Sequence, residues 1–338
     1  MKKRIQILLT ALALVVLAQS NLSAQDNALS PYLGTWALTL PPYDGAFNAG
    51  WLEVTQEDGY IGASVLWYGG SVTPVSHAFL EGGDLVVTFT GNRNLNGDKQ
   101  AMVTSWLQMH LERETLQGIR YSPRTDGTSV NRESFFGTKL PPDPPAPNLS
   151  NVKFGPAIKL LDQNSLKGWE IIGEATNGWS VSNGVLSNNP VQNDPNHHIH
   201  YGNLRTVQEF EDFNLTLEVN VPEGSNSGIY LRGIYEIQVF DSYGKPLDPH
   251  NMGALYSRIT PTMAAEKPAG EWQSLDITLV DRHVTVILNG KKIIDNQPVR
   301  GCTGGAITSN EFIPGPLYLQ GDHGTVEYRN IVIKPVVD

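Results

Sequence analysis

Two neighbouring segments in the second half of the chain carry the side chains best suited to chemistry. The first spans residues 226–232 (NSGIYLR). In an extended strand successive side chains point to opposite faces, so Ile229 and Leu231 share one face while Tyr230 and Arg232 share the other. The sequence therefore predicts one apolar face for a core and one face that carries an aromatic ring and a guanidinium group.

The second segment, residues 235–241 (YEIQVFD), repeats this alternation. Glu236 and Gln238 fall on one face. The residues that alternate with them form the opposite, apolar face: Tyr235, Ile237 and Val239. Side by side, the two segments would present a tyrosine, an arginine, a glutamate and a glutamine on one shared surface.

This shared polar face has the chemistry of a sugar-binding surface. Aromatic rings stack on the C–H faces of pyranose rings, and charged or amide groups hold hydroxyl or carbonyl oxygens. A plainer interpretation is an outer face in contact with solvent, stabilised by an ion pair between Arg232 and Glu236. The pattern alone leaves both interpretations open.

The elements that position these segments are predicted to be β-strands. Residues 213–221 alternate strictly between apolar and polar side chains, as a half-buried strand does. An Asn-Gly pair at residues 289–290 favours a two-residue hairpin turn, because both positions tolerate positive φ. It joins residues 283–288 to residues 292–295, and residues 324–334 predict the last strand. No amphipathic helix longer than two turns stands out, so the expected fold class is all-β.

The first half, residues 30–140, also consists of short strands separated by turns. Six strands are predicted after a Gly-Thr-Trp opening at residues 34–36: 51–56, 60–68, 85–90, 102–111, 115–121 and 134–139. A Gly-x-Trp opening followed by an antiparallel meander resembles lipocalin-like barrels, and any other small β-barrel or sandwich used for docking remains an alternative. It contains a group of large aromatic residues, most of which are expected in the core: Trp36, Trp51, Trp67, Tyr68 and Trp106.

Two further segments organise the chain. Residues 1–24 have a basic start, an apolar run and a small-residue exit, which predict an export signal rather than a membrane span. Residues 141–147 (PPDPPAP) are mostly proline, which fixes φ and lacks the amide donor. We therefore expect a linker at residues 141–152, a second domain at residues 153–338, and an exported protein that is periplasmic or extracellular.

The bulk composition narrows the classes of partner. The chain has 24 Lys and Arg residues and 34 Asp and Glu residues. Removing residues 1–24 takes away three basic residues, so the balance becomes 21 minus 34, or −13. Nucleic-acid binders concentrate basic residues on one face, so a nucleic-acid partner is not expected. The single cysteine, Cys302, cannot form an internal disulfide, and its glycine-rich surroundings favour a small packed residue over a nucleophile.

A series of motifs runs in order through residues 155–336. Besides the segments 226–232 and 235–239, it includes LKGW at 166–169, WSV at 179–181, GVL at 184–186, NLRT at 203–206, EDFNL at 211–215, GALY at 253–256, KPAGEW at 267–272, GPLYLQ at 315–320, DHG at 322–324 and VEYRNI at 326–331. Together these motifs resemble the 3-keto-disaccharide hydrolase domain. The resemblance implies a concanavalin-like jelly-roll sandwich with its site on the concave sheet. It also implies cleavage of a glycosidic bond after another enzyme has oxidised the C3 hydroxyl of the sugar.

A 3-keto sugar can be cleaved by elimination. The ketone acidifies the C2 hydrogen, a base removes it, the group at C1 leaves, and water adds to the resulting enone. Glu236 and His323 are the candidates for proton transfer, with Asp241 as a further carboxylate. Seven residues are expected to contact an oligosaccharide or glycoside substrate: Asn226, Tyr230, Arg232, Gln238, Tyr256, Lys267 and Gln320.

An ordinary glycoside hydrolase is disfavoured by one spacing. Sandwich β-glucanases place Glu-x-Asp-x-x-Glu on one strand, which supplies a nucleophile and an acid/base. Here the corresponding residues are Glu236, Gln238 and Asp241, so an amide replaces the middle acid and the last carboxylate is shorter. A non-catalytic carbohydrate-binding module on the same sandwich remains a second alternative.

The remaining polar clusters carry less weight. Histidine is a common metal ligand, and His197, His198 and His200 lie beside Tyr201. An exposed loop explains these histidines more simply. No cofactor is expected, with a divalent metal left as an alternative. Asp241 has two interpretations. It is either a site carboxylate or metal ligand, or a turn residue after the strand.

Overall fold

A computed structural model describes residues 28–43, 46–94, 100–173, 175–193 and 199–337. The chain divides into two compact units. The N-terminal unit comprises the described residues of Met1–Trp36, Leu52–Val65 and Pro74–Lys139. The sandwich unit comprises those of Ala37–Trp51, Leu66–Thr73 and Leu140–Asp338, so it includes two segments that precede the proline run.

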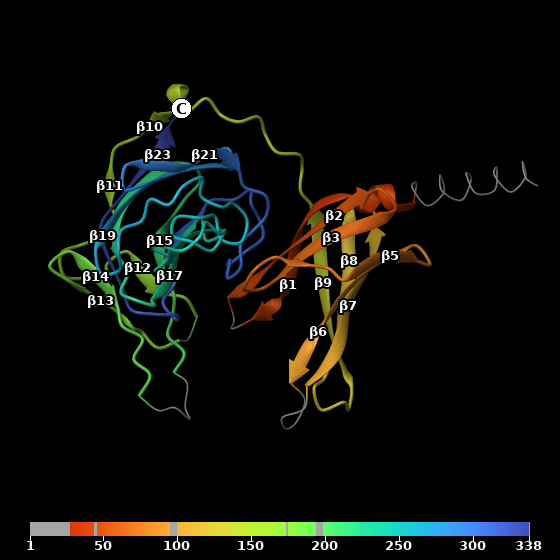
Figure 1. Cartoon of the computed structure of the whole chain (residues 1–338). Helices are drawn as coiled ribbons and strands as arrows, with labels where there is room; N and C mark the ends of the chain where they lie inside the picture. The colour runs from red at the N-terminus through yellow and green to blue at the C-terminus, as the bar shows by residue number, and fades with distance from the viewer. Residues whose placement is uncertain (1–27, 44–45, 95–99, 174, 194–198, 338) are drawn as a thin grey trace, which may run out of the picture. The chain divides into compact units, whose positions relative to one another are not determined.

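The first half of the chain forms a nine-stranded sheet in the order β4-β3-β2-β1-β9-β8-β7-β6-β5 (Figure 1). Its strands are β1 (Gly34–Tyr43), β2 (Phe47–Glu57), β3 (Tyr60–Trp67), β4 (Thr73–Pro74), β5 (His77–Glu81), β6 (Asp84–Asn94), β7 (Gln100–Glu112), β8 (Thr115–Pro123) and β9 (Val130–Lys139). The pairs from β5 to β9 are antiparallel. The six strands predicted from the sequence coincide with β2, β3, β6, β7, β8 and β9.

The sandwich consists of a larger and a smaller sheet. The larger sheet runs in the order β13-β14-β23-β16-β19-β20-β21, and β10 and β11 also pair with β23. Its strands are β10 (Lys153–Phe154), β11 (Ile158–Lys159), β13 (Trp179–Ser182), β14 (Val185–Asn188), β16 (Phe213–Asn220), β19 (Trp272–Val280), β20 (His283–Leu288), β21 (Lys291–Pro298) and β23 (Val326–Val337). The smaller sheet runs in the order β12-β15-β22-β17-β18. Its strands are β12 (Trp169–Ile171), β15 (Leu204–Phe210), β17 (Asn226–Leu231), β18 (Tyr235–Phe240) and β22 (Gly315–Leu319).

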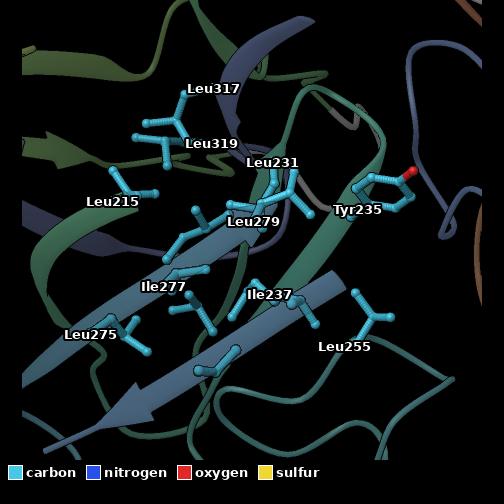
Figure 2. Packing of buried hydrophobic residues seen from close by; sticks show 14 of the residues in the cluster. Leu215, Leu231, Tyr235, Ile237, Leu255, Leu275, Ile277, Leu279, Leu317 and Leu319 are labelled. Atoms are coloured by element: carbon cyan, nitrogen blue, oxygen red, sulfur yellow. The ribbon is translucent and has the colours of Figure 1, made fainter. Parts of the chain in front are cut away.

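Apolar side chains from both sheets form one core. Figure 2 shows Leu215 and Ile277 of the larger sheet close to Leu231 and Ile237 of the smaller sheet. All four are completely buried, with 0 % exposed. Burial of one such side chain stabilises the fold by about 1.5–3 kcal/mol. The predicted all-β class is confirmed, and the second half is a two-sheet β-sandwich.

Residues 141–147 form no strand, as their prolines predict. Within the sandwich unit, this segment and the residues after it are tied down by polar contacts. Asp143 pairs with Arg300, and the Asn296 side chain donates a hydrogen bond of 3.0 Å to the Pro147 carbonyl. A domain boundary in the proline run stays a prediction.

The proposed export signal at residues 1–24 lies outside the described residues, and export stays a prediction. No helix in the described part of the chain is long and apolar enough to cross a membrane.

Candidate functional site

A cavity of about 250 Å³ lies in the sandwich unit. It opens on the face of β17, β18 and β22 that points away from the hydrophobic core. The structure brings seven of the ten predicted site residues to this cavity: Asn226, Tyr230, Glu236, Gln238, Tyr256, Gln320 and His323. The roles of these residues remain predictions, but the fold places all seven side chains around the same cavity.

Strand register explains how the polar side chains meet. β17 and β18 are antiparallel neighbours, and Tyr230 lies directly opposite Glu236. Two residues along, Gly228 lies opposite Gln238 on the same face. The intervening pair, Ile229 and Ile237, is completely buried in the core. The alternation predicted from the sequence therefore holds in both strands, and it separates the cavity side from the core side.

A glycine makes room for the carboxylate in the cavity. A Cβ atom at Gly228 would overlap the Glu236 carboxyl group. Any larger residue at this position would therefore force Glu236 to move. The Gly in the Asn-Ser-Gly motif serves close approach of a side chain rather than an unusual backbone angle.

The Glu236 carboxyl group is buried, with 3 % of the residue exposed. Burial disfavours its ionised form and raises its pKa from 4.5 to about 8. The nearby Tyr230 hydroxyl acts in the opposite direction and lowers the pKa of Glu236, whereas the charge of Asp322 raises it. Glu236 is therefore protonated at neutral pH and ready to exchange a proton near pH 8, a range that suits acid–base catalysis.

A carboxylate and an imidazole form a pair at the mouth of the cavity. Nδ1 of His323 lies 2.6 Å from Oδ1 of Asp322, and both side chains are nearly half exposed. This hydrogen bond raises the pKa of His323, while partial burial lowers it by less. His323 consequently holds its proton at higher pH than a free histidine does.

Two stacked tyrosines form one wall of the cavity. The rings of Tyr230 and Tyr318 are 4.0 Å apart and nearly parallel, with an angle of 9°. The Tyr230 hydroxyl donates to the Gly304 carbonyl at 2.6 Å, and the Tyr318 hydroxyl donates to the Gly305 carbonyl at 3.1 Å. Burial raises the pKa of both hydroxyls well above the usual range, so both stay neutral. They anchor the loop that carries Gly304 and Gly305.

The buried carboxyl group of Glu311 also holds that loop in place. Glu311 accepts hydrogen bonds from the Tyr235 hydroxyl at 2.7 Å and from the Gly301 amide at 2.8 Å. Cys302, next in the loop, is completely buried, and burial raises the pKa of its thiol to about 12. The interpretation of Cys302 as a small packed residue is confirmed, because a neutral, inaccessible thiol is not a nucleophile.

Two amide oxygens in the cavity can accept hydrogen bonds from a ligand. Oδ1 of Asn226 and Oε1 of Gln320 are buried and have no hydrogen-bond partner among the residues that the structure describes. A buried acceptor without a partner costs about 1–3 kcal/mol, and hydroxyl groups of a sugar would remove that cost. Gln238 differs, because its Oε1 accepts from the Val239 amide at 3.2 Å. Its amide N–H groups are therefore the part of the side chain suited to a ligand.

Three predicted site residues do not line the cavity. Arg232 follows β17 with φ of 57°, so the strand alternation ends before it. Its Nη2 atom donates to the carbonyls of Glu311, at 2.8 Å, and Ile313, and the side chain is buried. Arg232 therefore supports a loop instead of facing the substrate, and among the described residues no ion pair joins it to Glu236.

The other two residues outside the lining lie beyond strand ends. Asp241 follows the end of β18, and its Oδ2 accepts a hydrogen bond of 3.0 Å from the Gly224 amide. This contact agrees with the interpretation of Asp241 as a turn residue after the strand. Lys267 donates from Nζ to the Trp272 carbonyl at 2.8 Å. Neither contact leads to the cavity.

Several cavity residues were not predicted from the sequence. Asn203, Tyr318 and Asp322 all lie within recognised motifs, so the signal was present but was not attached to a role. A further group comes from the sandwich unit's two early segments: Tyr43, Phe47, Tyr68, Gly69 and Gly70. Tyr68 was expected in the core, and no local pattern distinguishes these residues.

In the described part of the chain, no group of three or more His, Cys, Asp or Glu residues could hold a metal ion. Of the histidines weighed as metal ligands, His197 and His198 lie outside the described residues. His200 is described, and its carbonyl accepts a hydrogen bond from the Thr176 amide.

The fold and the site define a two-sheet β-sandwich protein with a polar cavity on its smaller sheet. Residues 156–334 match the 3-keto-alpha-glucoside-1,2-lyase-like domain. Because the match spans more than half of the chain, the chain belongs to this family. A search among curated proteins finds none similar to it.

Solved structures with a similar sandwich come from several bacteria. A crystal structure from Parabacteroides distasonis ATCC 8503, assigned as a glycosyl hydrolase, is 30 % identical, with a TM-score of 0.44. The match covers 58 % of this chain and 93 % of that one. A second structure with the same assignment and source is 20 % identical, with 54 % and 94 % covered and a TM-score of 0.45. A carbohydrate-binding module, CBM66 from Bacillus subtilis, is 12 % identical, with 49 % and 95 % covered and a TM-score of 0.33.

Proposed function

We propose that the protein is an enzyme that cleaves the glycosidic bond of 3-keto-glycosides by elimination followed by hydration. The C2 hydrogen leaves as a proton, its electron pair forms the C1=C2 double bond, and the C1–O bond breaks. The leaving oxygen takes up a proton. The aglycone is thereby released, and water then adds across the C1=C2 bond and gives the free 3-keto sugar. Atoms and electrons balance without a redox partner in this step.

The observation that carries this proposal is the buried Glu236 carboxyl group beside the Asp322–His323 pair. With its pKa near 8, Glu236 is a stronger base than an exposed glutamate once it loses its proton. Elimination needs one base and one acid. An ordinary retaining hydrolase needs two opposed carboxyl groups about 5–5.5 Å apart, and the strand carboxylate that would supply the second, Asp241, faces a turn instead.

The cavity offers a group for each step of the elimination. Glu236 removes the C2 proton, and protonated His323 gives a proton to the leaving oxygen. The amide N–H groups of Gln238 stabilise the enolate oxygen that develops at C3. The oxygens of Asn226 and Gln320 accept hydrogen bonds from the remaining hydroxyls and fix the orientation of the ring.

The substrate requirement is tested with a matched pair, a 3-keto-glucoside and its unoxidised parent. We expect turnover of the 3-keto compound and almost none of the parent, because without the ketone the C2 hydrogen is too weakly acidic for a side chain to remove. Release of aglycone is followed for both compounds at equal concentration. Equal turnover of the parent would support an ordinary hydrolase, and binding without turnover of either compound would support a carbohydrate-binding module.

The Asp322→Asn variant is expected to shift the pH optimum of kcat/KM to lower pH. The hydrogen bond that His323 donates to Asp322 is the main cause that raises the pKa of His323, and the charge of Asp322 also raises the pKa of Glu236. Without this charge both pKa values fall. The base is then deprotonated at lower pH, and the acid also loses its proton at lower pH, so both limbs of the profile move in the same direction.

This shift is measured from kcat/KM between about pH 5 and 10. Asp58→Asn, at an exposed position of the N-terminal unit, is the matched control and should leave both limbs unchanged. Limbs that stay in place or move apart in Asp322→Asn would contradict the assigned roles of Glu236 and His323.

A further inference from the structure

Two early segments of the chain lie outside the family match and still belong to the sandwich unit. They are Ala37–Trp51 and Leu66–Thr73, whereas the match begins at residue 156. Backbone hydrogen bonds join them to the loop that follows Cys302. The Gly305 amide donates to the Tyr68 carbonyl at 3.0 Å, and the Asn48 amide donates to the Ile307 carbonyl at 3.4 Å. The early segments are thus fixed to the loop that the two stacked tyrosines hold.

The loop sequence permits this close approach. A Cβ atom at Gly301 would overlap the Trp51 ring, and one at Gly304 would overlap the Gly70 backbone. Trp51 is buried with the sandwich core, with 4 % exposed, and the Arg258 guanidinium lies 4.1 Å from the centre of its ring. The close contact between the early segments and the loop therefore depends on glycine at both positions and on the buried tryptophan.

The early segments bring aromatic rings to the cavity that contains Glu236. Phe47 lies 6.5 Å from the ring of Tyr318, at an angle of 55°. Tyr43 and Tyr68 lie 5.7 Å apart, at an angle of 42°. Tyr68 also has a positive φ of 61°, which is costly for a bulky side chain. Such strain is concentrated at functional sites, where the surrounding structure holds it.

Two members of this aromatic group, Phe47 and Tyr68, offer little hydrogen bonding to a ligand. Phe47 has no polar atom, and the Tyr68 hydroxyl already donates to the Pro41 carbonyl at 2.5 Å. A second sugar ring would need partners for several hydroxyls, since a buried hydroxyl without one is costly. A flat apolar ring needs none and gains from stacking against aromatic side chains.

We propose that Phe47 and Tyr68, with Tyr43, form a subsite for a planar, apolar aglycone of the glycoside. The proposal rests on the proposed function for its orientation, with the sugar near Glu236 and the aglycone near Phe47. It assigns a task in substrate selection to segments that the family match does not cover. The chain should accordingly prefer aryl glycosides to alkyl glycosides and to disaccharides.

The test measures binding of unoxidised ligands by calorimetry, so it does not depend on whether C3 oxidation triggers cleavage. The ligands are phenyl α-glucoside, methyl α-glucoside and maltose. The full chain is compared with Phe47→Ala, Phe47→Leu and Phe47→Tyr, and Phe79→Ala is the matched control. Phe79 is an exposed phenylalanine of β5 that does not line the cavity. Thermal melting is recorded for each variant.

We expect the chain to bind the phenyl glucoside more tightly than the other two ligands. Phe47→Ala should weaken phenyl glucoside binding on the order of 10-fold and methyl glucoside binding by less than about 2-fold. Phe47→Leu should also lose the phenyl preference, because it keeps apolar volume but no ring, and Phe47→Tyr should keep it. Equal losses for the phenyl and methyl ligands, an unchanged preference in a folded Phe47→Leu, or tighter binding of maltose would overturn the proposal.

Discussion

Replacement of Glu236 by glutamine is expected to lower kcat on a 3-keto-glucoside by about 10²–10⁴-fold. Glutamine has the shape of the protonated side chain but cannot take up the C2 proton. Because glutamine fills the same space beside Gly228, the cavity should keep its form and ligand binding should persist. Glu223→Gln, at an exposed position outside the cavity, is the matched control and should retain full activity.

The same Glu236→Gln variant should be more stable than the wild type at alkaline pH. The pKa of Glu236 is raised from 4.5 to about 8 on folding, so the folded chain binds this proton more tightly. The free energy of unfolding of the wild type therefore falls as pH rises from about 4.5 to about 8, and this contribution is constant outside that window. The shift corresponds to a cost on the order of 5 kcal/mol above pH 8. Glutamine avoids this cost.

Denaturant unfolding of both proteins at several pH values measures this difference. The stability advantage of Glu236→Gln should grow between about pH 5 and pH 8 and then level off. A constant difference across this range would show that Glu236 does not titrate with a raised pKa. Unchanged turnover in Glu236→Gln would remove Glu236 from proton transfer.

Replacement of His323 by alanine is expected to lower kcat by about 10²–10⁴-fold on a methyl 3-keto-glucoside. The methoxide leaving group is a strong base and needs a proton as the C1–O bond breaks. A 4-nitrophenolate leaving group is stable without that proton, so the loss on the nitrophenyl 3-keto-glucoside should be much smaller. Glu236→Gln should depress both substrates alike, since every elimination needs the C2 proton removed.

Comparison of the two leaving groups distinguishes the residue that acts as the acid from the residue that acts as the base. His77→Ala, at an exposed histidine of the N-terminal unit, is the matched control and should not change either rate. If His323→Ala slows both substrates equally, His323 is not the acid for the leaving group.

Much of the fold and part of the site follow from local patterns. Alternation in residues 226–231 and 235–240 predicts which side chains face the core, and the register of β17 and β18 brings Tyr230 and Glu236 together on the predicted polar face. The Asp322-His323-Gly324 motif also reaches the cavity. These features depend on neighbours in sequence or on one hairpin, which a single sequence can reveal.

The errors arise where a local pattern ends or where distant segments meet. Alternation predicts that Arg232 shares a face with Tyr230, but its positive φ breaks the strand and turns the side chain toward Glu311 and Ile313. Phe47 is 271 positions before Tyr318, and their proximity depends on how the early segments pack in the sandwich unit. No periodicity within either segment encodes that contact.

The central claim, cleavage by elimination, is tested most directly by the fate of the hydrogen at C2. A 3-keto-glucoside is cleaved in deuterated water, and the released sugar is reduced at once with borohydride so that exchange stops. Mass spectrometry then locates deuterium, and the free 3-keto sugar incubated with Glu236→Gln gives the background. We predict one deuterium at C2 in the released sugar, well above this background. Cleavage with the original hydrogen retained at C2 would contradict the account and indicate direct hydrolysis.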